Sequence, residues 1–158
     1  MHPNAAVIER FYSALGRRDA EAMLACYAPD VTFSDPVFPA LDAAGVAAMW
    51  RMLCARGKDL EVSASCIEAD ATAGRAHWDA TYTYSGTGRR VVNAIDATFA
   101  FRDGRICRHQ DRFGLYRWLR QALGWKGVAL GWLPAVQRKV RAQAAGALAQ
   151  FRAQSAAR

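Results

Sequence analysis

The sequence predicts an α+β fold in which a curved antiparallel β-sheet wraps around N-terminal helices. In the first third of the chain, apolar residues recur at the three-to-four-residue spacing of helices. Between residues 60 and 113 they alternate with a period of two, as in half-buried strands. Beyond residue 113 helical spacing returns. We therefore expect a cone-like domain over residues 1–113 and a basic, amphipathic helical extension over residues 114–158.

Each helix of the first third has a recognisable start or stop. Residues 4–15 carry apolar side chains on one face. Asp19 is an expected N-cap for a short second helix, with Tyr27 on its buried side and Pro29 as its stop. Asp42 is an expected N-cap for a third helix that ends at Ala55.

Four strands are expected after the third helix, and short turns separate them. Asp103-Gly104 is the strongest hairpin signal in the chain, and Gly86-Thr87-Gly88 marks another turn. The four alternating segments span residues 60–67, 75–85, 90–102 and 105–113. Such strands, joined by turns, form an antiparallel sheet with one face on the helices.

The run from Val31 to Phe38 places Asp35 among apolar neighbours, immediately before Pro36. A buried carboxylate is costly unless it is paired or protonated, so a functional role would explain its position. An aspartate before proline is also common at the start of an exposed turn. This stretch alone leaves both interpretations open.

The composition indicates a globular chain with an uneven charge distribution. The 158 residues are 53% hydrophobic and 22% charged, with a net charge of +7. All 14 acidic residues lie at or before Asp111, whereas residues 114–158 hold eight Lys and Arg and no acid. With 13 basic residues, the body has a charge of −1. The overall basicity therefore says little about what the body binds.

No cofactor or metal is predicted. The four cysteines are scattered without metal-ligand spacing, as expected for small core residues of a reduced, cytoplasmic protein. No glycine-rich phosphate loop, Ser–His–Asp order or nucleotide fingerprint is present. No signal pattern is visible at the start of the chain, and the longest weakly polar run, residues 122–136, is too short to span a bilayer.

Three short motifs carry a resemblance to a known superfamily. They are Tyr27-Ala28-Pro29-Asp30-Val31, Phe33-Ser34-Asp35-Pro36-Val37 and Asp103-Gly104-Arg105-Ile106. With the order of helices and strands, residues 5–113 resemble the nuclear transport factor 2-like superfamily, which includes SnoaL-like cyclases and ketosteroid isomerase. The resemblance implies a cystatin-like α+β barrel roll, an apolar pocket inside the cone, and a homodimer formed sheet to sheet.

The resemblance to ketosteroid isomerase also implies site residues. Its Asp-Pro strand supplies a general base, which falls on Asp35. A second, protonated aspartate on its third long strand donates a hydrogen bond to the oxyanion, and Asp96 occupies the matching place. Its helical tyrosine is replaced here by Phe11. Because a shift of one residue rotates a helical side chain by ~100°, Tyr12 is not expected to substitute for it.

The last strand adds two more candidates, His109 and Asp111. The family register turns both into the cone, and SnoaL-like members use an acid near this point for acid–base work. Asp96 has the alternative of a salt bridge across the sheet, and His109 with Asp111 that of a pair at the rim. The predicted aromatic walls for a flat ligand are Phe11, Tyr12, Phe33, Trp50, Trp78, Tyr82, Phe99 and Phe113.

These residues suit proton transfer without a cofactor. A carboxylate in an apolar pocket has a raised pKa and can take a proton from carbon beside a carbonyl, provided that a donor stabilises the enolate. We therefore expect a small hydrophobic, polycyclic or carbonyl-containing ligand, and chemistry of the isomerase, cyclase or dehydratase (lyase) type. The alternative is a non-catalytic module that binds a ligand, a protein or a membrane through the cone and the tail.

The basic tail has three interpretations. Trp118, Trp125 and Trp132 alternate with arginines and lysines, as in helices that lie on an anionic membrane surface. The apolar face can instead pack on the cone or on a second subunit. Nucleic acid is the least favoured partner, because no recognised binding motif is present.

Overall fold

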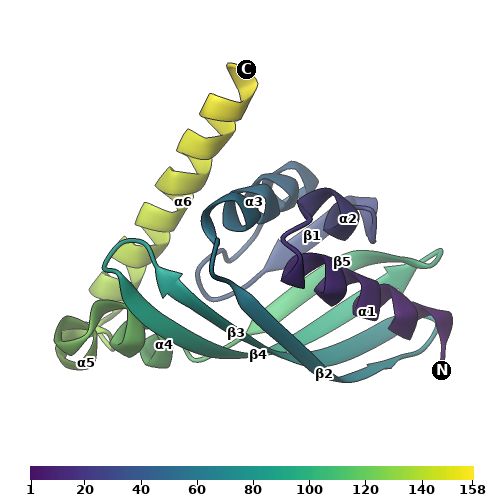
Figure 1. Cartoon of the computed structure of the whole chain (residues 1–158), viewed down its shortest axis with the longest axis horizontal. Coiled ribbons are helices and arrows are strands. Elements are labelled where there is room, and N and C mark those ends of the chain that lie inside the picture. The colour runs from purple at the N-terminus through teal and green to yellow at the C-terminus, as the bar shows by residue number, and fades with distance from the viewer.

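The structure, a computed structural model that describes residues 1–158, is built on a curved five-stranded sheet (Figure 1). The strand order is β1-β5-β4-β3-β2. The strand bounds are β1 Tyr27–Ser34, β2 Glu61–Ala69, β3 Ala73–Tyr84, β4 Arg89–Arg102 and β5 Arg105–Arg112. The β2–β3, β3–β4 and β4–β5 pairs are antiparallel, which confirms the predicted curved sheet over four strands.

Three helices lie on one side of the sheet (Figure 1). They are α1 Pro3–Gly16, α2 Ala20–Leu24 and α3 Ala43–Arg56. Asp19 accepts a hydrogen bond from the Ala22 amide at 3.0 Å, and Asp42 accepts one from the Gly45 amide at 2.8 Å. Each bond satisfies an amide that the first turn leaves without a partner, so both predicted N-caps are confirmed.

The first strand differs from the prediction. Tyr27 and Pro29 belong to β1 rather than to the second helix, and β1 runs parallel to β5. Pro29 is tolerated because β1 is an edge strand whose register shifts between Tyr27 and Thr32. The sheet is therefore mixed, and β1 ends at Ser34, one residue before Asp35.

Side chains of the long strands alternate between the core and the outer surface, as their sequences predict. On β3, Trp78 is buried, whereas the neighbouring His77 and Asp79 face outward. Trp78 pairs with Ile95 of β4, which is also buried. The inner face packs on α1 through Ile8 and neighbouring residues, and this contact forms the main hydrophobic core.

Three helices follow the sheet: α4 Leu115–Leu123, α5 Trp125–Leu130 and α6 Pro134–Ala156. α4 buries Leu119 and Trp118 against Val91 of β4. The segment after Gly124 forms the short helix α5. α6 rises past α3 (Figure 1) and contributes Leu148 to the main core. None of the helices is long and apolar enough to cross a membrane.

The position of α5 depends on a close backbone contact. A Cβ atom added at Gly127 would lie 2.0 Å from the carbonyl oxygen of Leu119. No side chain fits at that distance, so α5 packs directly on the backbone of α4.

Replacement of Gly127 by alanine should therefore destabilise the protein. We expect Gly127→Ala to lower the free energy of unfolding by about 2 kcal/mol, because α5 must move away from α4. Gly146→Ala is the matched control, since a Cβ atom there meets nothing within 4 Å. That helical substitution should stabilise α6 by ~0.5–1 kcal/mol. Equal midpoints for both variants in urea unfolding would contradict this account.

Candidate functional site

Asp35 lies in the turn that follows β1, where it has a structural role. Its Oδ1 accepts hydrogen bonds from the amides of Val37 and Phe38, at 2.7 and 2.6 Å. Its own amide donates to the Phe38 carbonyl at 2.9 Å. This is the turn-forming role that aspartate before proline commonly has. Oδ2 makes no hydrogen bond within the chain, so one oxygen of the carboxyl group is free to contact a ligand.

The carboxyl group of Asp35 is nonetheless largely removed from water. Burial raises its pKa to about 6, against the lowering effect of the two amide bonds, and the charge of Asp111 raises it further. The carboxylate is therefore a stronger base than an exposed aspartate, while it remains mostly ionised at neutral pH. The two interpretations of Asp35 thus hold together: it forms a turn and is a candidate base.

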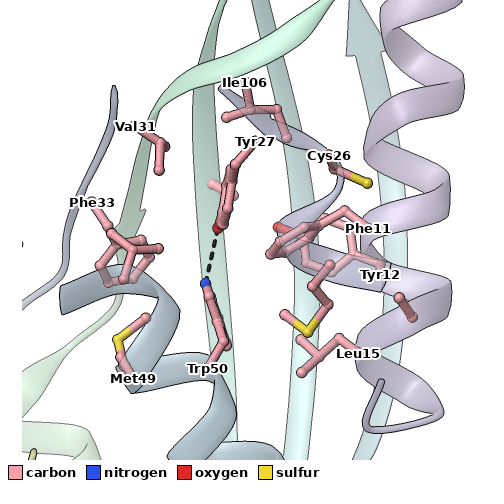
Figure 2. Close-up of a cluster of buried hydrophobic side chains, with 14 of the residues drawn as sticks. Phe11, Tyr12, Leu15, Cys26, Tyr27, Val31, Phe33, Met49, Trp50 and Ile106 are labelled. Carbon is pink, nitrogen blue, oxygen red and sulfur yellow. Dashed lines mark hydrogen bonds between the residues drawn. The ribbon is translucent and has the colours of Figure 1, made fainter. Parts of the chain in front are cut away.

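A second carboxylate, Asp111, ends a chain of buried hydrogen bonds. Trp50 Nε1 donates to the hydroxyl oxygen of Tyr27 at 2.9 Å, as Figure 2 shows. That hydroxyl lies 2.8 Å from Nδ1 of His109. Nε2 of His109 lies 2.9 Å from Oδ1 of Asp111. Four residues from α3, β1 and β5 are therefore connected in one relay.

The relay has a definite direction. Burial raises the pKa of Tyr27 well above its usual value, so its hydroxyl keeps its proton. Since the oxygen accepts the Trp50 N–H, the hydroxyl proton points to Nδ1 of His109. The ring N–H is then on Nε2, and it donates a hydrogen bond to Oδ1 of Asp111. His109 thereby holds one oxygen of Asp111 in place.

Aromatic rings surround His109 on several sides. The nearest is Phe99 at 4.5 Å between ring centroids, followed by Phe33 at 5.0 Å and Phe11 at 5.4 Å. Figure 2 shows Phe11 and Phe33 with Tyr27 and Trp50 in this packed cluster. His109 has no exposed surface, and only 3% of the Asp111 side chain is exposed. The imidazole therefore cannot change its orientation without disturbing the core.

Asp35 and Asp111 line the same cavity. Its volume is about 290 Å³, and it lies where β1 and β5 end. The lining residues are Ser34, Asp35, Pro36, Pro39, Gln110, Asp111 and Arg112. Two carboxyl groups and a guanidinium thus surround one space, an arrangement suited to a polar substrate group and to proton transfer.

The structure brings Asp35, His109 and Asp111 together but leaves out Asp96. Period-two alternation on β4 buries Ile95 and turns Asp96 to the outer face, where 80% of its side chain is exposed. Asp96 lies 2.8 Å from Nδ1 of His77, which raises the pKa of that histidine. The prediction of Asp96 as a donor inside the cone was wrong, because the side chain lies on the opposite side of the sheet.

The predicted aromatic walls do not line this cavity. Phe11, Tyr12, Phe33, Trp50, Trp78 and Phe99 are buried in the main core, and Tyr82 and Phe113 are half-buried beside it. A larger cavity, about 380 Å³ and mostly apolar, lies between α6 and residues 37–41. It contains none of the predicted site residues. The expected apolar pocket around Asp35 is therefore replaced by a polar one.

Two buried donors lack a partner. The Tyr12 hydroxyl and the Trp78 indole nitrogen make no hydrogen bond, and their rings are 5.5 Å apart. Burial raises the pKa of Tyr12 well above its usual value, and the charge of Asp111 adds to this rise. Tyr12 is thus inside the cone despite the one-residue shift from Phe11, because the curved sheet contacts both side chains of α1. Phe11 packs beside His109 of β5, and Tyr12 packs beside Trp78 of β3. Unpaired buried donors are costly and call for an explanation.

Sequence reasoning missed Tyr27 as a site residue and did not foresee Trp50 as a hydrogen-bond donor. The signal for Tyr27 was present in the Tyr27-Ala28-Pro29-Asp30-Val31 motif, which was used only to predict the fold. No group of three or more His, Cys, Asp or Glu side chains is placed to hold a metal ion.

A family model for the SnoaL-like domain matches residues 8–109. This range covers most of the chain: it begins within α1, includes Asp35, and ends at His109 of β5. The chain belongs to the SnoaL-like domain family. A comparison with curated proteins finds no match.

Solved structures show the same SnoaL-like fold. A nuclear transport factor 2-like protein of unknown function from Burkholderia pseudomallei has a TM-score of 0.69 at 20% identity, over 77% of this chain and 98% of that one. TerC, co-crystallised with polyporic acid, gives 0.67 at 18%, over 77% and 99%. A putative polyketide cyclase from Xanthomonas campestris pv. campestris gives 0.60 at 26%, over 76% and 96%. These matches confirm the predicted fold, and together with the family model they confirm the predicted superfamily.

Removal of the Tyr27 hydroxyl from this SnoaL-like protein should be costly. Tyr27→Phe leaves both Trp50 Nε1 and His109 Nδ1 without a partner in the core. We expect the free energy of unfolding to fall by about 2–3 kcal/mol. Tyr116→Phe, which removes a half-buried hydroxyl bonded to the Val128 carbonyl, should cost well under ~1 kcal/mol. A Tyr27→Phe variant as stable as Tyr116→Phe in chemical unfolding would argue against the relay.

The raised pKa of Asp35 should make the protein less stable as pH rises. Between pH 4 and about 6 the folded state holds a proton on Asp35 that the unfolded state releases, so stability falls with pH in this window. The loss amounts to at most ~3 kcal/mol. In Asp35→Asn this loss is absent, so the variant should gain stability relative to wild type between pH 4 and 7.5.

The measurement is urea unfolding at both pH values. Asp103→Asn, in the exposed β4–β5 turn, is the control and should keep the wild-type dependence. If Asp35→Asn follows the wild type at both pH values, the carboxyl group is not destabilised by burial.

Proposed function

We propose that this SnoaL-like protein binds a small carbonyl-containing molecule at the cavity between β1 and β5 and moves protons on it without a cofactor. One observation carries the proposal: Asp35 and Asp111 line the same cavity, and the pKa of Asp35 is raised to about 6. Two carboxyl groups whose environments differ can serve as base and acid in one reaction.

Asp35 has the role of base in this proposal. Its free Oδ2 takes a proton from carbon adjacent to the substrate carbonyl, which gives an enol or enolate. The turn amides of Val37 and Phe38 hold Oδ1, so the carboxylate needs no reorientation before the transfer. The proton is then returned to another position of the substrate, as an isomerase, cyclase or dehydratase requires.

Asp111 has the role of a positioned partner. His109 fixes one of its oxygens, and the relay through Tyr27 and Trp50 fixes His109. The second oxygen of Asp111 can accept a hydrogen bond from a substrate hydroxyl group or exchange a proton with it. Arg112 in the same lining can attract a substrate oxygen that carries negative charge.

The oxyanion donor that Asp96 was expected to supply is assigned to Tyr12, with Trp78 beside it. Both have a polar N–H or O–H group that is buried and unpaired. Neither group lines the cavity, so a substrate carbonyl would reach them only if the core beside Tyr12 opened; it would then pair with these donors and be polarised in return. The charge of Asp111 contributes to the raised pKa of Tyr12, which supports an interaction between the two groups.

The size of the cavity limits the substrate. About 290 Å³ is at the lower end of the ~300–1,000 Å³ typical of ligand pockets. A molecule with one or two rings fits this space better than a steroid-sized one. Two structural relatives support the chemical class: one is a putative polyketide cyclase, and the other was co-crystallised with polyporic acid.

The proposal predicts hydrogen–deuterium exchange at carbon next to a carbonyl. A panel of small cyclic and aromatic ketones and 1,3-diketones, incubated with the protein in D₂O, should include compounds whose exchange by NMR exceeds that in buffer. Asp35→Asn should slow this exchange by ~10²–10⁴-fold, the usual contribution of a positioned base. Asp111→Asn should also slow it, whereas Asp96→Asn on the outer face should leave it unchanged.

The pH profile gives a second readout of the same assay. Exchange should rise with pH through about 6, because Asp35 must lose its proton to act as a base. An exchange rate that survives Asp35→Asn would contradict the assignment of the base. Tight binding of a panel compound without any exchange would favour the non-catalytic alternative.

A further inference from the structure

The strongest apolar feature of the surface lies on α5 and the residue pair that follows it. Seven large hydrophobic side chains are exposed in the whole chain, and four of them fall within residues 125–132. We call these four the tryptophan surface: Trp125, Val128, Leu130 and Trp132. The two indoles are 74% and 61% exposed. Side chains of this kind are rarely left in water in such a cluster without a partner.

The tryptophan surface is held rigidly. α5 packs on α4 through Gly127, and the Tyr116 hydroxyl of α4 donates to the Val128 carbonyl at 2.8 Å. α4 in turn is fixed to the sheet, where Trp118 Nε1 donates to the Tyr82 hydroxyl at 2.6 Å. The exposed indoles therefore stand on a platform joined to the core, unlike side chains on a mobile tail.

Polar groups of this segment are already hydrogen-bonded within the chain, which suits an apolar environment. Trp132 Nε1 donates to the Ala129 carbonyl at 3.0 Å, and the Gly131 amide donates to the Gly127 carbonyl at 2.9 Å. Polar groups bonded within the chain cost less to remove from water than free ones. The segment can therefore lose water from its outer side without leaving many polar groups unpaired.

Two cations, Lys126 and Arg120, lie beside the tryptophan surface and its supporting helix. Lys126 Nζ lies 5.9 Å from the Trp125 ring centroid, and the Arg120 guanidinium lies 5.4 Å from that of Tyr116. Residues 114–158 contain eight Lys and Arg and no acidic residue, and none of the eight forms a salt bridge. The cations are thus available to an external anion.

We propose that the tryptophan surface docks the protein on an anionic lipid bilayer. Indole rings favour the headgroup level of a membrane, and lysine and arginine bind anionic headgroups beside them. The apolar anchor and the cations together provide the two signals that stable membrane association needs. This docking involves neither Asp35 nor Asp111, so it is independent of the proposed chemistry.

The positive charge of Lys126 and Arg120 also argues against other partners at the tryptophan surface. In a symmetric dimer the same patch meets itself, so Lys126 and Arg120 would approach their own copies without an acidic residue nearby. Nucleic acid would satisfy the cations and could stack on the indoles, but it offers little to Val128 and Leu130. An anionic bilayer accommodates the charged and the apolar groups at once.

The test is co-sedimentation of the full chain with vesicles of phosphatidylcholine alone and of phosphatidylcholine mixed with phosphatidylserine. We expect binding to the mixed vesicles and weaker binding to the neutral ones. Salt should weaken the electrostatic part of the binding. The double variant Trp125→Ala/Trp132→Ala should reduce partitioning at least ~10-fold, or ~1.4 kcal/mol. Val92→Ala, an exposed apolar residue on the outer sheet face, is the control and should bind as wild type.

Quenching by brominated phospholipids supplies a structural readout. Trp50, Trp78 and Trp118 are buried, so contact quenching of wild-type fluorescence reports Trp125 and Trp132. Quenching that is strong in wild type and lost in the double variant supports the proposal. Equal partitioning of the two proteins, or no binding to the mixed vesicles, overturns it.

Two further outcomes would also overturn the proposal. One is a wild-type dimer in light scattering that the double variant abolishes, without vesicle binding, which would make the patch a contact between copies. The other is preferential binding of a DNA duplex over the mixed vesicles. Thermal unfolding of the double variant should match the wild type, because both indoles are exposed.

Discussion

The relay from Trp50 through Tyr27 and His109 to Asp111 is the interaction on which the rest of the structure depends. It joins α3, the edge strand β1 and β5 across the centre of the core. The three hydrogen bonds that link these residues are buried, so the relay fixes the packing of those three elements. It also positions the Asp111 carboxylate at the cavity, which Asp35 lines from the turn after β1.

The sequence was sufficient to predict the α+β fold, the strand alternation and two helix caps, because these depend on local spacing. Asp35, His109 and Asp111 were also predicted, Asp35 from its place in an apolar Asp-Pro stretch and His109 and Asp111 from the register that the family resemblance supplied, and the structure places the three close together. Asp96 was misplaced because a resemblance supplied its position, whereas its own period-two pattern beside Ile95 turns it outward. Alternation along a strand was the stronger evidence in this case.

The remaining site features depend on contacts between distant segments, which no local pattern reveals. Tyr27 of β1 contacts His109 of β5 across 82 residues, and Trp50 contacts Tyr27 from helix α3. The polar lining of the cavity arises because the aromatic side chains expected to form its walls pack on one another instead. Tyr12 was predicted as a wall residue of the cone, and helical geometry argued only against its acting as the missing tyrosine donor; the structure buries it together with Phe11.

The contact between Arg141 and the Asp35 turn has a consequence for the order of folding. Arg141 Nε donates to the Pro36 carbonyl at 2.8 Å, across 105 residues of sequence. During synthesis the turn therefore gains this support only after α6 has left the ribosome as far as Arg141. The sheet and most of its core can assemble earlier, so the Asp35 turn is the part of the candidate site that is completed last. A chain cut short before α6 would retain Asp35 but would lack the helix that lies over it.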